Sequence, residues 1–284
     1  MKQNQLVIEK VKQTLIRAAT TFRSDQKDAY LKAIKQETTP RAKWVLENLV
    51  ENSDVAKQNK SPMCDDTGIP HLILEVGKNH SVDGDLLKSI QQGVADGLRE
   101  LPGRPMAIKG DDVQRLDQSG GLDQDPGALS PAPIIIKHVE QDELRLHILM
   151  QGGGPEIRGK TYRVFHQHDL QVVVDEVVSW AKQEVAKLGC VPCVPTIGIG
   201  RTHFEAASLM LEAMTYGSFG IQNDIEREIT ERINQTNVGP LGLNGNTTAL
   251  ASFLRVGPQR ASGVRIVCLR LCCCVEPRVA STLL

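Results

Sequence analysis

The sequence predicts an α+β fold, in which a helical N-terminal region precedes a mixed α/β domain. Residues 1–58 carry apolar side chains at helical spacing, whereas the rest of the chain alternates short apolar runs with longer amphipathic segments. The 284 residues are 40% apolar and 24% charged, a composition typical of a globular protein that buries one large core or two ordinary ones. We therefore expect residues 1–58 to form a helical segment packed on a main domain of residues 59–284, together one structural unit.

The N-terminal region contains two amphipathic segments that predict helices. The first places four apolar residues on one helical face, namely Val7, Val11, Leu15 and Ala18. The second follows Pro40 and shows similar spacing at Trp44, Leu46, Leu49 and Val50. Neither segment carries a motif with evident chemistry.

The first part of the main domain predicts three strands, one helix and a long loop. The apolar run "IPHLILEVG", bounded by Gly68 and Gly77, predicts a strand. A helix is expected from residue 84, with Asp85 as a candidate N-cap and an apolar face formed by Leu87, Ile90, Val94 and Leu98. Residues 110–131 are polar and rich in glycine and proline, which favours a surface loop or lid. Two strands, "PAPIIIKHVE" and "ELRLHILMQ", follow it.

The second part predicts a long helix and further alternating elements. Apolar residues recur three and four apart from Asp169 to Leu188, and Gly189 ends the pattern as a helix C-terminal glycine. A short strand, "PTIGIG", leads into helices at residues 203–214 and 221–237. Two more strands are expected in "TTALASFLRV" and "GVRIVCLR".

Charge and hydropathy exclude two classes of partner. The 33 basic and 34 acidic side chains give a net charge of −1, without the basic stripe and interleaved aromatic residues of a nucleic-acid binding protein. The first fifteen residues mix charged with apolar positions, and no run of 18 apolar residues occurs, so neither a targeting segment nor a membrane span is expected. We expect a cytoplasmic protein with no nucleic acid and no membrane as partner.

The seven cysteines are placed unevenly and do not resemble a disulfide framework. Cys64 precedes a predicted strand, Cys190 follows the end of the long helix, and the run 272–274 follows a predicted strand, so three groups lie on loops. Cys268 lies inside an apolar strand and is interpreted as a small buried residue. Burial is also favoured for Cys193, although "CVPC" has the spacing of a zinc or redox pair.

Three kinds of cysteine chemistry can be compared. A closed zinc site needs four ligands, and "CCC" is not a second pair that matches "CVPC". A thioredoxin-like pair belongs at the start of a helix, whereas this pair follows a helix end. An iron–sulfur cluster fits better, because its thiolates can come from distant loops and three cysteines leave one iron open as a Lewis acid.

A set of short motifs then occurs in a fixed order. They are "CDDTG", "QGGGPEIRGK", "GCVPCVPTIGIG", "GPLGLNGNTT" and the cysteine-rich stretch that ends in "CVEPR". Together they resemble the α-type domain of the class I, iron–sulfur dependent fumarase family, and within it the tartrate dehydratase type of α subunit. The resemblance covers about residues 40–280, and the order of the motifs is more specific than any one of them.

The resemblance implies a [4Fe–4S] cluster that is held by three cysteines. Cys64 and Cys190 match two of the family's ligands, although Cys193 is an alternative to Cys190. The third ligand is assigned to Cys274, because the family has an arginine four residues after the cysteine and Arg278 stands there. Alignment of the preceding strand would select Cys272 instead, and Cys273 lies between the two.

The resemblance also implies a reaction, the reversible addition or removal of water on a small dicarboxylate such as fumarate/malate or L-tartrate/oxaloacetate. Asp66 matches the aspartate that exchanges a proton with the substrate, and Arg104 the arginine that binds a substrate carboxylate. Gly153, within a glycine triplet, would let the backbone approach the substrate. Asp65 stands where the family has glutamine, and an acid there should disfavour a carboxylate unless it is protonated or paired. A histidine expected before the third cysteine is missing.

The resemblance finally implies a partner. The family's second domain, which supplies the opposing catalytic group, is not in this chain, so we expect a β-type subunit and a heterotetramer with a dimeric core. Two other hypotheses remain open, a non-catalytic zinc-binding or scaffold protein on the same fold and a cluster that senses oxygen or redox state.

Overall fold

The structure is a computed structural model that describes residues 2–284. Its helices and mixed sheets confirm the predicted α+β class, including the helical N-terminal region. The chain divides into two compact units, each built from segments that are distant in the sequence. The first comprises residues 2–21, 53–152 and 278–284, and the second comprises residues 22–52 and 153–277.

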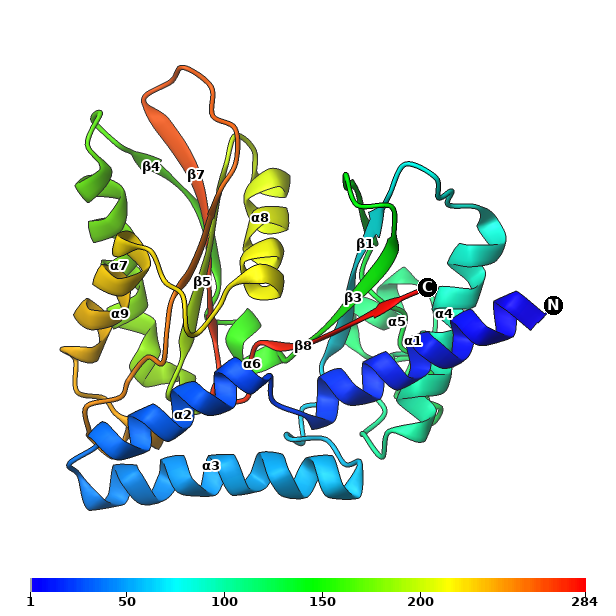
Figure 1. Cartoon of the computed structure of the whole chain (residues 1–284), viewed down its shortest axis with the longest axis horizontal. Helices are drawn as coiled ribbons and strands as arrows, with labels where there is room; N and C mark the ends of the chain where they lie inside the picture. The colour runs from blue at the N-terminus through cyan, green and yellow to red at the C-terminus, as the bar shows by residue number, and fades with distance from the viewer. Residues whose placement is uncertain (1) are drawn as a thin grey trace. The chain divides into compact units, whose positions relative to one another are not determined.

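The first unit is a four-stranded sheet with helices packed on it. The strands, in the order β2-β1-β3-β8, are β1 (Ile69–Val76), β2 (Ile135–His138), β3 (Leu144–Gln151) and β8 (Arg278–Leu283). Strand β1 is parallel to β2 and antiparallel to β3, and β3 is antiparallel to β8. Two helices, α1 (Lys2–Thr20) and α4 (Gly84–Glu100), pack on each other, and α1 also packs on β3 and β8 (Figure 1).

Its core confirms most of the predicted apolar faces. The four residues predicted to share the first helical face are buried, as are Ile90, Val94 and Leu98 of α4. The helix cap was predicted wrongly, because α4 begins at Gly84 and it is Asp83 whose carboxylate accepts a hydrogen bond from the Leu86 amide. That position leaves Asp85 in the first turn, where its charge faces the positive end of the helix dipole.

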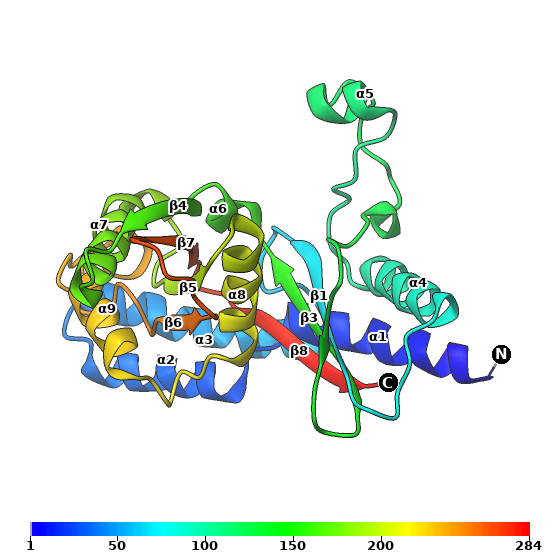
Figure 2. The ribbon, with the colours of Figure 1, turned by 90° about the horizontal axis from the view of Figure 1, so that it is seen from above.

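The segment predicted as a surface loop or lid contains two short helical elements. Helix α5 (Asp112–Asp117) begins with a capping box between Asp111 and Gln114, and a 3₁₀ turn, η1 (Pro126–Ala128), follows it. Figure 2 shows α5 at the tip of an arm that projects from the rest of this unit. None of residues 110–131 is buried, as expected of a surface segment, and the capping residues allow α5 to form although it has no apolar face.

The second unit is built around another four-stranded sheet, in the order β4-β7-β5-β6. Its strands are β4 (Lys160–Phe165), β5 (Val194–Gly200), β6 (Phe253–Val256) and β7 (Val264–Cys272). Strand β7 is antiparallel to β4 and β5, and β5 is parallel to β6. Its helices are α2 (Ser24–Gln36), α6 (Gly153–Glu156), α7 (Leu170–Leu188), α8 (His203–Tyr216), α9 (Asp224–Asn234) and the 3₁₀ turn η2 (Pro240–Gly242).

Helices α7 and α8 lie on opposite faces of this sheet (Figures 1 and 2). Asp169 caps α7 by accepting a hydrogen bond from the Gln171 amide, and Gly189 ends it at φ +77°. The predicted limits of this helix are therefore confirmed. Every residue of β5 is buried, which fits a strand that is covered on both faces.

The chain passes from the second unit to the first within helix α3 (Pro40–Asn59). Leu46 is buried as predicted, but Trp44 is 61% exposed. Residues two apart differ by about 200° around a helix, so these two side chains cannot share one face. Among residues 2–284, no helix is both long and apolar enough to span a membrane.

Candidate active site

The loop that precedes β1 carries the first group of candidate residues. Cys64 is half-buried, and its thiol lies 3.5 Å from a carboxylate oxygen of Asp65. The same oxygen accepts a hydrogen bond from the Asp66 amide at 2.9 Å, so Asp65 fixes the turn of the loop. Thr67 is buried, and Gly68 has φ +87°, a conformation that favours glycine. The sequence around Cys64 therefore specifies a tight turn that ends at the first residue of the sheet.

Arg278, the first residue of β8, is buried beneath the Cys64 loop and donates hydrogen bonds to its backbone. Its side chain is 1% exposed, and its Nη1 donates to the carbonyl oxygens of Asp66 at 2.8 Å and Thr67 at 3.1 Å. A methyl group at Gly68 would lie 2.6 Å from Nη2 of Arg278, and one at Gly152 would lie 2.9 Å from Oδ2 of Asp66. The two glycines thus leave the space that the guanidinium and the Asp66 carboxylate occupy.

Arg104 and Asp65 lie close together at the surface of this unit. Nη1 of Arg104 is 3.9 Å from Oδ2 of Asp65, and both side chains are exposed. The amide of Arg104 donates to the Thr67 hydroxyl at 3.2 Å, which ties the loop of Arg104 to the turn. The structure therefore pairs the unusual acid at position 65 with the arginine expected to bind a carboxylate, although an exposed pair at this distance is weak.

Three cysteines meet in the second unit. The amide of Cys274 donates to the carbonyl of Cys190 at 2.9 Å, so the end of α7 and the loop after β7 lie side by side. The thiol of Cys274 is in contact with those of Cys190 and Cys273, and these hydrogen bonds, followed by burial, raise its pKa well above the usual range. Cys190 is exposed, whereas Cys273 and Cys274 are buried. The predicted ligands Cys190 and Cys274 are thus neighbours.

The loop that carries Cys274 is fixed by buried polar contacts that the sequence did not suggest. From α2, the Tyr30 hydroxyl donates to the Cys274 carbonyl and Nε2 of Gln26 donates to the Glu276 carbonyl at 3.3 Å. The carboxylate of Glu276, which is fully buried, is paired with Arg270 at 3.2 Å. Arg270 also pairs with Glu156. An intact pair of this kind fixes a conformation, while the loss of one partner leaves a buried charge.

The other cysteines face the interior of the sheet. Cys272 is the last residue of β7, is fully buried and lies 3.6 Å from the Thr196 hydroxyl of β5. Cys193 is fully buried, and burial raises the pKa of its thiol to about 12. Cys268 is also buried. These three thiols fill the core, as predicted for Cys193 and Cys268.

The remaining candidates are placed as follows. Gly153 is exposed and begins α6 in the second unit. Cys64, Asp65, Asp66 and Arg104 belong to the first unit, whereas Cys190 and Cys274 belong to the second. Within residues 2–284, no group of three or more His, Cys, Asp or Glu side chains is positioned to hold a metal ion.

Replacement of Tyr30 by phenylalanine tests how the cysteine loop is held. Burial, followed by the nearby cysteine thiols, raises the pKa of Tyr30 well above its usual range. The unfolded chain therefore releases this proton first, and folding stability falls as pH rises above about 10. We expect Tyr30→Phe to lower the free energy of unfolding by about 1–3 kcal/mol at pH 7.5, since the Cys274 carbonyl loses its donor. The difference from wild type should shrink at pH 11.

Urea unfolding at both pH values measures this effect. Tyr216→Phe, on α8 of the same unit, is the matched control. An equal loss of stability in Tyr30→Phe at both pH values would contradict the assigned role of the Tyr30 proton.

Comparison with known proteins places these residues in a family. The sequence model described as "Fumarate hydratase (Fumerase)" matches residues 8–282, which is nearly the whole chain. The chain therefore belongs to the fumarate hydratase family and is an enzyme of the hydro-lyase class. The resemblance predicted from the order of the motifs is confirmed.

Relatives within the family extend this comparison. The chain is 26% identical over 286 residues to the "Putative L(+)-tartrate dehydratase subunit alpha" of Methanocaldococcus jannaschii, with 95% of this chain and 94% of the relative covered. It is 22% identical over 247 residues to the "L(+)-tartrate dehydratase subunit alpha" of Escherichia coli K12, with 83% and 78% covered. Proteins of the same name from Shigella boydii and Shigella sonnei show the same identity and coverage.

Proposed function

We propose that this chain is the α subunit of an iron–sulfur hydro-lyase that adds or removes water on a small dicarboxylate. The observation that carries the proposal is the meeting of Cys190 with Cys274, two residues that are 84 positions apart and that the motifs single out as ligands. Family membership supplies the class of reaction. The tartrate dehydratase relatives favour L-tartrate/oxaloacetate as the substrate pair, with fumarate/malate as the other candidate.

The donor set fits a cluster. The Cys274 thiol is in contact with those of Cys190 and Cys273, on the loops that follow α7 and β7, and thiolates are the ligands that iron–sulfur clusters use. Cys272 and Cys193 are packed inside the sheet, which favours Cys190 and Cys274 as the ligands. Cys64 of the first unit would supply the third thiolate. When bound, a [4Fe–4S] cluster with three such ligands supplies one Lewis-acidic iron for the substrate hydroxyl.

The chain's own residues would perform the remaining steps on the substrate. Asp66 would exchange the proton at the substrate carbon through Oδ2, the oxygen for which Gly152 leaves room. Arg278 holds the backbone carbonyls of Asp66 and Thr67 and so fixes the direction of the Asp66 carboxylate. Arg104 would bind a substrate carboxylate with its exposed guanidinium, and the backbone at Gly153 would approach the substrate closely.

A single aspartate cannot perform both proton transfers, so a partner is required. The printed names of the relatives describe alpha subunits, which supports a β-type subunit that supplies the opposing catalytic group. The proposed assembly is a heterotetramer with two copies of each chain, located in the cytoplasm.

The test is anaerobic reconstitution of the purified chain with iron and sulfide. We expect about four irons and four sulfides per chain, with cluster absorption in the visible range. Cys64→Ser, Cys190→Ser and Cys274→Ser should each reduce the iron bound, and Cys268→Ser, which alters a cysteine packed within β7, should not. One zinc per chain without sulfide would favour the zinc scaffold. A stable cluster with no turnover after addition of the β-type subunit would favour the redox sensor.

Replacement of Asp65 by glutamine, the residue that the family has there, tests substrate recognition. The Asp65 carboxylate lies 3.9 Å from Nη1 of Arg104 and lowers the positive potential that a substrate carboxylate would meet. We expect Asp65→Gln to lower the KM for a dicarboxylate by about 3–10-fold, which corresponds to roughly 1 kcal/mol for an exposed charge. Steady-state kinetics of the complex with its β-type subunit measures the change. Asp117→Asn, on the arm that carries α5, is the control, and an unchanged KM in Asp65→Gln would contradict the interpretation.

A further inference from the structure

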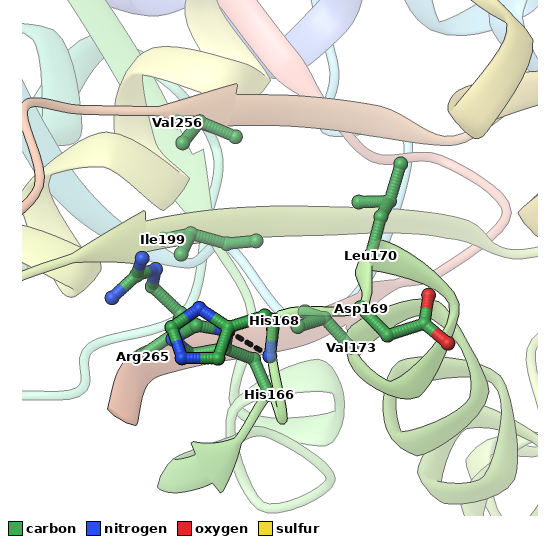
Figure 3. A pocket seen from close by; sticks show the side chains of 8 residues that line it. All are labelled: His166, His168, Asp169, Leu170, Val173, Ile199, Val256 and Arg265. Atoms are coloured by element: carbon green, nitrogen blue, oxygen red, sulfur yellow. Dashed lines mark hydrogen bonds between the residues drawn. The ribbon is translucent and has the colours of Figure 1, made fainter. Parts of the chain in front are cut away.

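A cavity of about 370 Å³ lies in the second unit, away from the cysteine group. Its walls come from the connection between β4 and α7 and from the ends of three other strands (Figure 3). They are formed by His166, His168, Asp169, Leu170, Val173, Ile199, Val256 and Arg265. Small-molecule sites occupy roughly 300–1,000 Å³, so the volume is that of a small ligand.

The cavity lies at the edge of the sheet where strands β4, β5 and β6 end. Strands β4, β5 and β6 run in the same direction, because β4 and β5 are both antiparallel to β7 and β5 is parallel to β6. Their carboxyl ends therefore share one edge, and α7 and α8, which follow β4 and β5, lie on opposite faces. The cavity lies at this edge, between the start of α7 and the ends of β5 and β6.

The cavity is distant from the cysteine group of the same unit. Strand β7 begins beside the cavity at Val264 and ends at Cys272. Eight steps of about 3.3 Å separate these residues by roughly 26 Å. A ligand in the cavity would therefore not touch the cysteine group of the same unit.

One side of the cavity is built from preorganised polar groups. The His166 ring accepts a hydrogen bond at Nδ1 from the His168 amide at 3.0 Å and donates from Nε2 to the Ser262 carbonyl at 2.9 Å, so the orientation of the ring is fixed. Gln167 and His168 both have positive φ values, +50° and +58°. Such conformations are uncommon outside glycine and are often retained at functional sites. They place the His168 ring edge-on to His166, with the ring centroids 5.2 Å apart.

Arg265 supplies the charge on this side. Its Nη1 donates to the carbonyls of Ser262 and Val264, both at 3.0 Å, which fixes the guanidinium beside the two histidine rings. The only acid in the lining, Asp169, already accepts a hydrogen bond from the Gln171 amide as the cap of α7. Figure 3 shows its carboxylate directed away from Arg265. The polar side of the cavity is therefore suited to an anion.

The other side is apolar. Val173 and Ile199 are buried, and Leu170 and Val256 are 58% and 56% exposed, so the wall continues to the surface. A guanidinium next to such a wall matches a carboxylate with a short hydrocarbon body. We propose that this cavity is a second binding site that takes a small amphipathic monocarboxylate, with Arg265 and His168 at the carboxylate and Leu170, Val173 and Val256 around the hydrocarbon chain.

The probe is hexanoate, titrated into the full chain and followed by calorimetry and by amide NMR shifts. Hexanoate should bind and shift the amides of residues 166–170, whereas hexylamine, with the same chain and opposite charge, and acetate, with no chain, should bind at least tenfold more weakly. Arg265→Met should weaken hexanoate at least tenfold. Arg163→Met is the matched control. Arg163 lies in β4, its guanidinium packs over the Phe165 ring of the same strand, and it does not line the cavity. This variant should change the affinity by less than twofold.

Arg265→Met could also disturb the loop at Ser262 and Val264, to which Arg265 donates hydrogen bonds, so a second variant tests the site without this effect. Leu170→Glu adds a negative charge to the exposed wall without removing a hydrogen bond, and it should weaken hexanoate at least fivefold. Equal binding of hexanoate and hexylamine, or an unchanged affinity in Leu170→Glu, would overturn the proposal. The test needs no cluster and no turnover, so its result is independent of the proposed function.

Discussion

Replacement of Arg278 by methionine should lower the free energy of unfolding by about 3 kcal/mol. Methionine keeps most of the volume but removes the donors to the carbonyls of Asp66 and Thr67, and a buried acceptor left without a partner costs about 1–3 kcal/mol. The loop that carries Cys64 and Asp66 would lose its internal support. Because a shift of about 1 Å in a catalytic group can cost 10²-fold in rate, turnover should fall by about that factor.

Chemical denaturation and steady-state kinetics measure the two effects. Arg17→Met is the matched control, since Arg17 donates to the Ser281 carbonyl of the same strand from an exposed position and its loss should cost less than about 1 kcal/mol. Arg278→Lys should restore part of the stability, because an ammonium group can still donate to one of the carbonyls. Wild-type stability in Arg278→Met would show that the loop is held by other contacts.

The sequence predicted the loop but not the residue that holds it. Arg278 entered the prediction only as a spacing marker for Cys274. Its position depends on the pairing of β3 with β8, where Arg278 lies opposite Met150, two residues before Gly152. Strand β8 was not predicted, because "RVASTL" is short and half of it is polar or charged. A contact between residues more than two hundred positions apart leaves no periodic signal in the sequence.

The same reason explains why the support of the second cysteine loop was missed. Tyr30 lies in a helix whose periodicity indicates only burial, and its partner, the carbonyl of Cys274, is a backbone atom that any residue could provide. The burial of Arg270 and Glu276 could not be predicted either, since charged residues are expected at the surface unless a partner is known. The positions of Cys64, Cys190 and Cys274 on loops could be predicted, because they follow from where elements end.

The chain's division into two units could not be predicted from composition. Helices α1 and α2 are separated by three residues, yet they belong to different units. No proline-rich or glycine-rich linker marks this change, and β8 returns to the first unit after the second is complete. Local patterns identify the elements and their caps, whereas the assignment of an element to a core depends on which apolar faces meet.

Replacement of Asp66 by asparagine should abolish most turnover and leave the fold intact. Asparagine has the shape of aspartate and can occupy the space beside Gly152, but it cannot exchange a proton at the substrate carbon. General acid–base groups contribute about 10²–10⁴-fold, so we expect a loss of kcat within that range when the complex with the β-type subunit is assayed. The iron bound per chain should be unchanged, since Asp66 is not one of the proposed ligands.

A second readout separates the loss of a proton acceptor from a displaced loop. In deuterated water, the wild-type complex should incorporate solvent deuterium at the substrate carbon, and Asp66→Asn should lose this exchange together with turnover. Arg278→Met, which leaves the carboxylate in place but loosens its loop, should retain measurable exchange. If Asp66→Asn loses turnover and keeps wild-type exchange, then another group transfers the proton and Asp66 acts only in binding.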